Sequence, residues 1–264
     1  MFTHNLDPVF LDFGFLSIRW YSLAYIAGII IGWWMGKKII SKKFQGSNSQ
    51  VEITDFDNLI TYIIISIIIG GRIGYVIFYN LKFYFLNPFE IIKIWEGGMS
   101  FHGALIGIII GTRIYAHKRK ISSFIFLDVI ACVAPIGIFF GRIANFINGE
   151  LIGKTTSVPW GVIFPKIDMM SRHPSQLYEA FLEGIVLFFI LKIYINKKDY
   201  LIGTCSCLFL ISYGFLRIVS EIFREADTQV GYFFNFLSMG SILSIIMIFF
   251  GFVLFNYISK KNEK

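Results

Sequence analysis

The chain has 264 residues, the length of one or two ordinary domains, but its composition is not that of a soluble protein. Hydrophobic residues make up 56% of it and charged residues 16%. Soluble domains average about 25% charged residues, so too few charges are present here to cover a water-facing surface. The formal net charge of +7 therefore indicates contact with anionic lipid, and no nucleic-acid partner is expected. The composition predicts an all-α integral membrane protein and argues against a disordered or disulfide-stapled secreted chain.

Seven stretches are apolar and long enough to cross a bilayer, which takes about 20 residues. They are Ile18–Gly36, Leu59–Phe78, Met99–Tyr115, Phe124–Phe146, Leu177–Ile195, Leu201–Phe223 and Phe236–Tyr257. We interpret residues 1–264 as a single polytopic membrane domain, in which residues 148–175 form a small head.

Lysine and arginine are unevenly divided between the two sides of these spans. The connections after odd-numbered spans, together with the C-terminal tail, carry twice as many as the opposite side. Such an excess marks the cytoplasmic side of a membrane protein. The sequence therefore predicts an N-terminus outside, a C-terminus inside and an extracytoplasmic head.

Small residues recur every four positions in three of the spans, a spacing that lets helices approach closely. They are Gly28, Gly32 and Gly36, then Ser66, Gly70 and Gly74, then Gly103, Gly107 and Gly111. We interpret these ladders as helix-packing surfaces.

Charged side chains inside the spans are the functional candidates, because an arginine near the bilayer centre costs about 2.5 to 3.5 kcal/mol on insertion scales. Arg72, Arg142 and Arg217 are such residues. Each can pair with a carboxylate and lock the bundle, or bind an anionic group. For Arg72, beside Gly70-Gly71, the sequence leaves a lipid headgroup and a carboxylate equally open.

The sixth span carries Tyr213, Arg217, Glu221 and Arg224 at spacings of four, four and three. These spacings place all of them within about 80° of one helix face. Glu221 can pair with either arginine, which leaves one guanidinium for an anion such as phosphate. A structural ion-pair ladder is the alternative.

Two helix ends supply further candidates. Near the end of the fourth span, Arg142 and Asn145 share a face, and the following Asn148-Gly149 is a turn signal. At the start of the third span, His102 lies beside glycines, where an imidazole could titrate near neutral pH and reach a substrate. A single histidine on an apolar helix can also be purely structural.

Together these segments resemble the prolipoprotein diacylglyceryl transferase family of bacterial membrane enzymes, over nearly the whole chain. The most specific piece is Gly141-Arg142-x-x-Asn145-Phe146-x-Asn148-Gly149-Glu150-x-x-Gly153. Supporting segments are Arg19-Trp20-Tyr21, residues 97–103, residues 172–180, and Tyr213-Gly214-x-x-Arg217 through Glu221 and Arg224. Ala104 and Ala144 stand where the family usually has glycine, which affects local packing more than chemistry.

The resemblance implies a transferase that moves the diacylglyceryl group of phosphatidylglycerol onto the lipobox cysteine thiol of a prolipoprotein signal peptide. The products would be a thioether and glycerol phosphate, in the first step of bacterial lipoprotein maturation. The expected location is the bacterial inner (cytoplasmic) membrane. No cofactor or metal is expected, since the displacement requires neither.

The resemblance also assigns roles to individual residues. The expected catalytic residues are His102, Arg142, Arg217, Glu221 and Tyr21. The expected phosphatidylglycerol-binding residues are Arg142, Asn145, Glu150, Gly153, Tyr213, Arg217 and Arg224.

We hypothesise that Arg142 and Arg217 bind the phosphate and that Glu221 orients Arg217. Asn145 and Tyr21 would position the glycerol. His102 would be either the base that takes the thiol proton or a positioning donor. These guanidiniums should converge from separate helices, beside a cavity large enough for a phospholipid head.

Two other classes of protein remain to be weighed. A lipid or anion transporter would spread intramembrane charges through the membrane depth, whereas here most gather toward the outer side. A non-catalytic lipid-binding scaffold would have no need to retain His102, Arg142 and Arg217 together.

Overall fold

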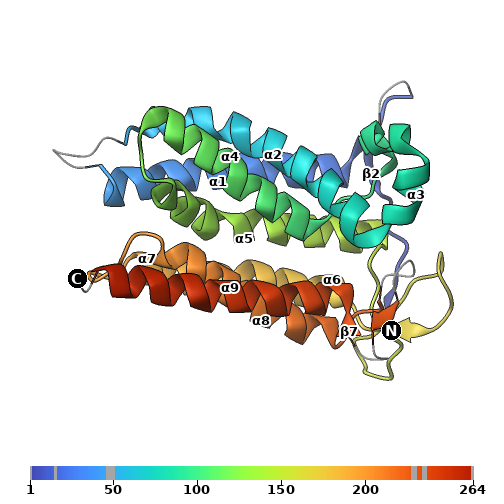
Figure 1. Ribbon diagram of the computed structural model, residues 1–264. Coiled ribbons are helices and arrows are strands. Elements are labelled where there is room, and N and C mark those ends of the chain that lie inside the picture. Colours follow the sequence, from blue (N-terminus) through green and yellow to red (C-terminus); the bar gives the residue numbers. More distant parts are fainter. Residues whose placement is uncertain (1, 15–16, 46–50, 227–230, 234–236, 263–264) are drawn as a thin grey trace. The chain divides into compact units, whose positions relative to one another are not determined.

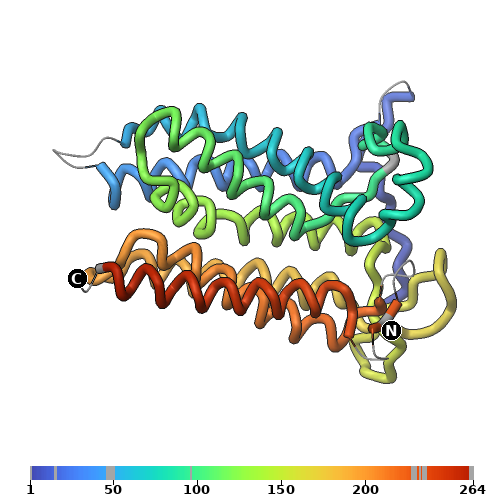
Figure 2. The backbone as a smooth tube through the Cα atoms, viewed as in Figure 1, coloured from blue at the N-terminus to red at the C-terminus, as the bar shows by residue number. Residues whose placement is uncertain are grey.

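The computed structural model describes residues 2–14, 17–45, 51–226, 231–233 and 237–262. Nearly all of its long elements are helices (Figures 1 and 2), as the composition predicts. The chain divides into two compact units. The first unit comprises the described residues of 1–35 and 130–264, and the second unit those of 36–129.

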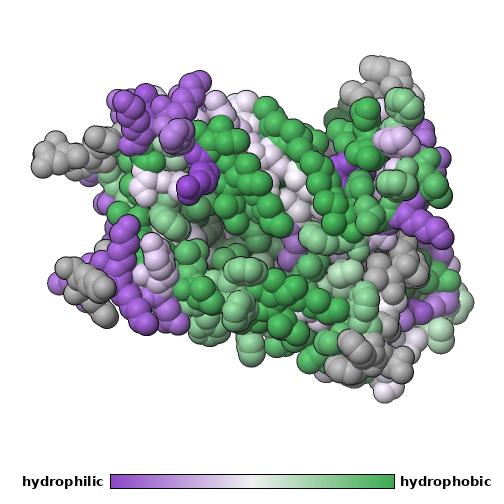
Figure 3. Space-filling view, in the orientation of Figure 1, coloured by the Kyte–Doolittle hydropathy of each residue, from purple (hydrophilic) through white to green (hydrophobic). Residues whose placement is uncertain are grey.

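Among the described residues, five helices are long and apolar enough to cross a membrane, so the chain is a multi-pass membrane protein. They are α1 (Trp20–Lys43), α2 (Ile53–Tyr79), α5 (Ser123–Asn148), α8 (Thr204–Glu221) and α9 (Met239–Asn262). In Figure 3, hydrophobic residues cover the sides of the helices and hydrophilic residues gather toward their ends.

All five of these helices begin one to six residues away from the starts of the spans predicted from the sequence. The first begins at Trp20 and not at Ile18, because residues 17–19 form a strand. Phe236, where the seventh predicted span begins, lies outside the described residues.

The third and fifth predicted spans are also helical, but they do not meet the same criteria of length and composition. α4 (Phe101–Arg119) ends in a basic turn. The fifth span is divided into α6 (Ser175–Glu179), the π-helical η3 (Ala180–Val186) and α7 (Leu187–Ile195), and it buries two glutamates. The structure thus supports five spans by composition.

In the first unit, helices pack closely where glycines replace larger side chains. α8 packs along α9, and Gly214 of α8 has no room for a Cβ beside Ile248. Gly28 of α1 faces Gly137 of α5, where a Cβ on Gly28 would lie 3.0 Å from the Cα of Gly137. The predicted packing role of Gly28 is therefore confirmed.

The predicted head is a small sheet built on the first unit. β1 (Phe2–Thr3) pairs in parallel with β4 (Val162–Ile163), which pairs antiparallel with β5 (Ser171–Arg172). An isolated bridge between Gly153 and Arg224 ties the head to the chain just after α8. Two hairpins complete the strands of this unit: β2 (Val9–Asp12) with β3 (Ser17–Arg19), and β6 (Tyr232–Phe233) with β7 (Leu237–Ser238).

In the second unit, α2 packs along α4 at the two predicted glycine ladders. A Cβ on Gly74 would come within 2.5 Å of the Cα of Gly103, and one on Gly70 within 2.9 Å of the Cα of Gly107. The two backbones therefore touch directly, which confirms the packing interpretation. The connection between these helices consists of α3 (Leu81–Leu86), η1 (Pro88–Ile92) and η2 (Ile94–Glu96).

Arg72 of α2 anchors this connection. Its side chain is buried, and its guanidinium donates to backbone carbonyls. The acceptors are the carbonyls of Ile91 at 2.9 Å, Glu90 at 2.7 Å, Lys93 at 3.1 Å, Gly97 at 2.5 Å and Gly98 at 3.3 Å. The segment that leads into α4 and His102 is thereby fixed to α2.

Replacing Arg72 should destabilise the second unit. We expect Arg72→Gln to lower the free energy of unfolding by about 1 to 3 kcal/mol, because several partly buried carbonyls lose their donor. Thermal unfolding in detergent, compared with Lys82→Gln at an exposed position of α3, measures the effect. Equal melting temperatures for the two variants would show that Arg72 does not anchor the connection.

The head should lose stability in acid. Arg172 donates to Asp168 at 2.5 Å and holds the pKa of that carboxyl below its ordinary value. A carboxyl whose pKa is lowered by folding stabilises the folded state above its ordinary pKa of about 4, and this contribution is lost as the pH falls through the lowered value. Amide protection at Thr156 and His173, whose N–H groups bridge the head strands, should therefore drop in acid. Asp168→Asn should remove this part of the pH dependence, and an unchanged acid response would contradict the assignment.

Candidate active site

Two glutamates form the centre of a polar cluster in the first unit. Glu179 and Glu183 lie one helical turn apart where α6 meets η3, and both side chains are 0% exposed. Arg142 of α5 contacts both of them. Its Nη1 is 2.9 Å from Oε2 of Glu179, and its Nη2 is 3.1 Å from Oε2 of Glu183.

Two further arginines reach the same glutamates from α8 and the residues after it. Nη1 of Arg217 lies 3.0 Å from Oε1 of Glu179 and 3.3 Å from Oε1 of Glu183, while its Nη2 pairs with Glu221. Nη1 of Arg224 lies 3.0 Å from Oε1 of Glu179. We call these three arginines and three glutamates the arginine–glutamate cluster. Its formal charges balance.

Hydroxyl groups complete the cluster. Ser220 donates to Oε1 of Glu183 at 3.0 Å, and Ser238 of β7 donates to Oε2 of Glu221 at 2.9 Å. Tyr213 lies one turn before Arg217 and is 1% exposed. The buried carboxylates thus accept from both charged and neutral donors, the condition under which ionised groups are tolerated away from water.

The structure brings Arg142, Arg217, Glu221 and Arg224 together as the sequence predicts, and it decides between the two pairings left open for Glu221. Arg217 takes Glu221, and Arg224 pairs with Glu179 instead. The prediction of a spare guanidinium is wrong, because each of the three arginines contacts a glutamate.

Sequence analysis missed Glu179 and Glu183. The signal that could have found them is a pair of carboxylates four residues apart inside an apolar stretch, where an unpaired charge would be costly.

A second polar group lies on the same helix as Arg142. Asn145 follows Arg142 by three residues on α5 and donates through Nδ2 to the hydroxyl of Tyr21. That hydroxyl donates to Oε2 of Glu150 at 3.3 Å, and Nδ2 of Asn148 donates to Oε1 of Glu150 at 3.2 Å. We call Tyr21, Asn145 and Glu150 the glycerol group, after the role expected for it. The predicted residues therefore meet in space although they come from two elements and a loop.

Gly153 has a structural reason to be glycine. A Cβ there would lie 2.8 Å from the carbonyl oxygen of Phe223 and 2.8 Å from the Cβ of His173. Its carbonyl accepts from Nη1 of Arg172 at 3.0 Å. The position allows the head strands to approach the end of α8, and it places Arg224 beside Glu179.

His102 belongs to the second unit, whereas the arginine–glutamate cluster belongs to the first. It lies in the first turn of α4, which is capped by Ser100, whose hydroxyl accepts from the N–H of Gly103 at 3.3 Å. This cap and the Arg72 contacts hold the segment before the imidazole in place.

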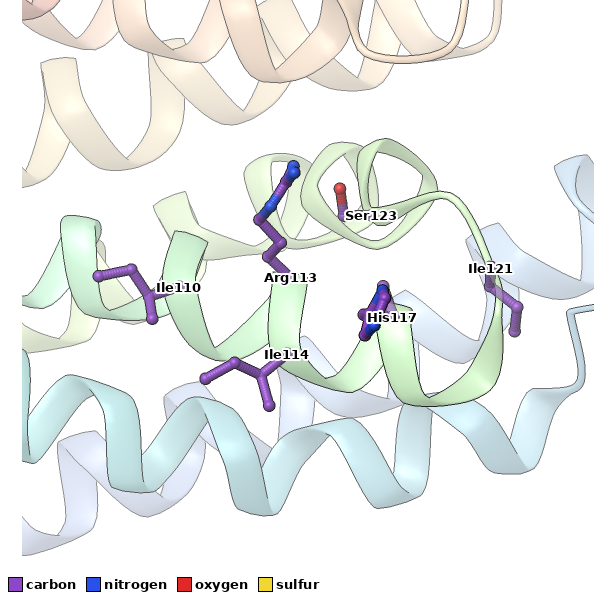
Figure 4. Close-up of a pocket in the computed structure, with 7 residues that line it drawn as sticks. Ile110, Arg113, Ile114, His117, Ile121 and Ser123 are labelled. Carbon is purple, nitrogen blue, oxygen red and sulfur yellow. The ribbon is translucent and has the colours of Figure 1, made fainter.

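The second unit also holds an open cavity of about 500 Å³ at the other end of α4 (Figure 4). None of the predicted site residues lines this cavity. This hollow is therefore not the headgroup-sized cavity that the sequence predicts beside the arginines.

The chain is similar to known transferases over almost its whole length. The model of the family described as prolipoprotein diacylglyceryl transferase matches residues 8–257. A phosphatidylglycerol–prolipoprotein diacylglyceryl transferase of Rickettsia bellii (strain OSU 85-389) is 49% identical over 249 residues, which cover 94% of this chain and 93% of that protein. The one of Rickettsia typhi (strain ATCC VR-144 / Wilmington) is 50% identical over 253 residues, covering 95% and 96%. The chain belongs to the prolipoprotein diacylglyceryl transferase family.

Proposed function

We propose that this protein transfers the diacylglyceryl group of phosphatidylglycerol to the lipobox cysteine of a prolipoprotein. The thiolate attacks the glyceryl carbon that carries the phosphate ester, a carbon–sulfur bond forms and the carbon–oxygen bond to phosphate breaks. The electron pair leaves with the phosphate oxygen, so the products are a thioether and glycerol phosphate. One observation carries the proposal. Arg142 of the arginine–glutamate cluster and Asn145 of the glycerol group lie one turn apart on the same face of α5.

Arg142 is the side chain best placed to hold the phosphate. Its side chain is 14% exposed, against 9% for Arg217 and 7% for Arg224. Glu179 and Glu183 fix the plane of its guanidinium, so its donors are oriented before the lipid arrives. Pre-oriented donors that face a developing negative charge are the main means by which enzymes stabilise such leaving groups.

The glycerol group supplies the neutral contacts. Hydroxyl, amide and carboxylate groups match the hydroxyls of a glycerol headgroup, and Asn145, which donates to Tyr21, lies one turn beyond Arg142 on α5. A phosphate held by Arg142 would place its glycerol toward Tyr21 and Asn145. Choline or ethanolamine headgroups lack those hydroxyls, which supports phosphatidylglycerol as the donor lipid.

Charge balance bears on how the thiol loses its proton. Three glutamates neutralise the three arginines of the cluster, so the cluster has little net field with which to lower the thiol pKa. We therefore assign His102 as the proton acceptor, in preference to a positioning donor. The substrate supplies the nucleophile, so the chain's own cysteines need no role.

We place the protein in the bacterial inner membrane as a single polytopic domain of seven spans. The excess of lysine and arginine in its odd-numbered connections supports an N-terminus outside, a C-terminus inside and an outer head at 148–175. In this orientation the cluster lies toward the outer leaflet, where exported prolipoproteins present their lipobox.

Purified protein, phosphatidylglycerol and a lipobox peptide should yield a peptide whose mass has increased by one diacylglyceryl group. We expect Arg142→Lys to lose about 100-fold or more in rate, because a single ammonium cannot replace the planar fork that two glutamates orient. Arg113→Lys, an exposed position of α4, is the matched control and should keep its rate. No modified peptide from the unaltered protein would refute the activity, and normal turnover by Arg142→Lys would refute the phosphate contact.

His102→Gln tests the proton acceptor. Glutamine keeps a hydrogen bond but not basicity, so the rate should fall by about 100-fold or more near neutral pH. The deficit should shrink at alkaline pH, where solvent deprotonates the thiol. His117→Gln, on the same helix, is the control and should behave like the unaltered protein. A variant with the unaltered rate across the pH range would exclude His102 as a base.

A further inference from the structure

The open cavity at the C-terminal end of α4 combines basic and apolar side chains. It is lined by Ile110, Arg113, Ile114, His117, Ile121 and Ser123. Figure 4 shows Arg113 and His117 projecting from successive turns of α4, with Ser123 at the start of α5 on the same side as the guanidinium. Neither the arginine–glutamate cluster nor the glycerol group contributes a residue to it.

The electrostatics of this end of the second unit favour an anion. Nearby carboxylates are matched by other cations: Asp55 is 2.6 Å from Nε of Arg119, and Asp57 is 3.1 Å from Nζ of Lys37. Arg113 and His117 are exposed and lie one turn apart, so a phosphate between them would accept from both. The cavity therefore offers hydrogen-bond donors where the local charge is positive.

The apolar part of the lining indicates the rest of the ligand. Ile110 and Ile114 are 54% and 57% exposed along the side of α4 that leads away from the basic residues toward the helix centre. A free phosphate has no use for such a surface, whereas an acyl chain would cover it. Basic residues at the end of a membrane helix followed by exposed isoleucines match a phospholipid, with its head at the interface and its tail along the helix.

We propose that this cavity binds an anionic phospholipid, with the phosphate between Arg113 and His117 and an acyl chain along Ile110 and Ile114. The site serves no step of the transfer reaction. With the orientation given above, it faces the cytoplasmic leaflet, where it anchors the end of α4 opposite to His102.

Native mass spectrometry of the full-length protein in detergent tests this site, with phosphatidylserine as the anionic probe and phosphatidylcholine as the neutral one. We expect phosphatidylserine to bind more tightly to the unaltered protein. The double variant Arg113→Gln/His117→Gln should weaken the first bound phosphatidylserine about 30-fold, since two lost basic contacts at about 1 kcal/mol each amount to about 2 kcal/mol. Lys118→Gln is the control. It removes one positive charge from the same end of α4 without changing a residue that lines the cavity, and it should retain binding.

Three further results separate this proposal from its alternatives. Arg142→Lys should bind the probe as the unaltered protein does, because the site is not the catalytic one. Inorganic phosphate in excess should leave the lipid bound if the acyl chain contributes, and complete displacement would show a phosphate site only. The proposal would be overturned if Lys118→Gln weakened binding as much as the double variant does, or if the two lipids bound equally tightly. Retained transferase activity of the double variant would show that this variant is folded.

Discussion

The structure of the first unit depends on the mutual neutralisation of three arginines, two of them buried, and three buried glutamates. Glu179 by itself contacts three guanidiniums, which come from α5, from α8 and from the chain after α8. Removing one partner from such a network typically costs about 3 to 5 kcal/mol, because the charge left behind remains buried and uncompensated. The relative positions of these helical segments are therefore set by charge pairing, whereas apolar packing in lipid discriminates little between alternative helix arrangements.

The same constraint shapes the chemistry. A neutral cluster does not attract an anion from a distance, so in the proposed reaction recognition of the phosphate would depend on the orientation of donors at short range. Two glutamates determine that orientation for Arg142, and a π-helical turn carries one of them. π-helical turns are found often at functional sites, where they place a side chain that a regular helix would direct elsewhere. Glu183 is therefore as much a part of the site as the arginines it holds.

The sequence predicts those features that depend on local spacing. The stripe from Tyr213 to Glu221, the approach of Asn145 to Arg142 and the glycine contacts between α2 and α4 all follow from helical periodicity. The predicted place of Arg224 on the same helix face is wrong, because α8 ends at Glu221 and Arg224 bridges to Gly153 beyond it. The pairing of Arg224 with Glu179 and the carbonyl ligands of Arg72 do not follow from it. Both join segments distant in sequence, and a buried arginine accepts carboxylates and carbonyls alike, so residue type alone could not identify the partner.

Arg72 and Arg142 have different kinds of partner, which explains why Arg142 is suited to the proposed phosphate contact and Arg72 is not. Arg72 gives its donors to carbonyls of a fixed backbone segment, and these contacts persist whether or not a substrate is present. Arg142 gives its donors to carboxylates that also have other partners, namely Arg217, Arg224 and Ser220. When a phosphate competes for the guanidinium of Arg142, Glu179 and Glu183 keep those other donors, so no carboxylate is left buried and unpaired. Redundant pairing within the cluster would thus allow Arg142, which stabilises the fold, to bind a lipid headgroup as well, as we propose.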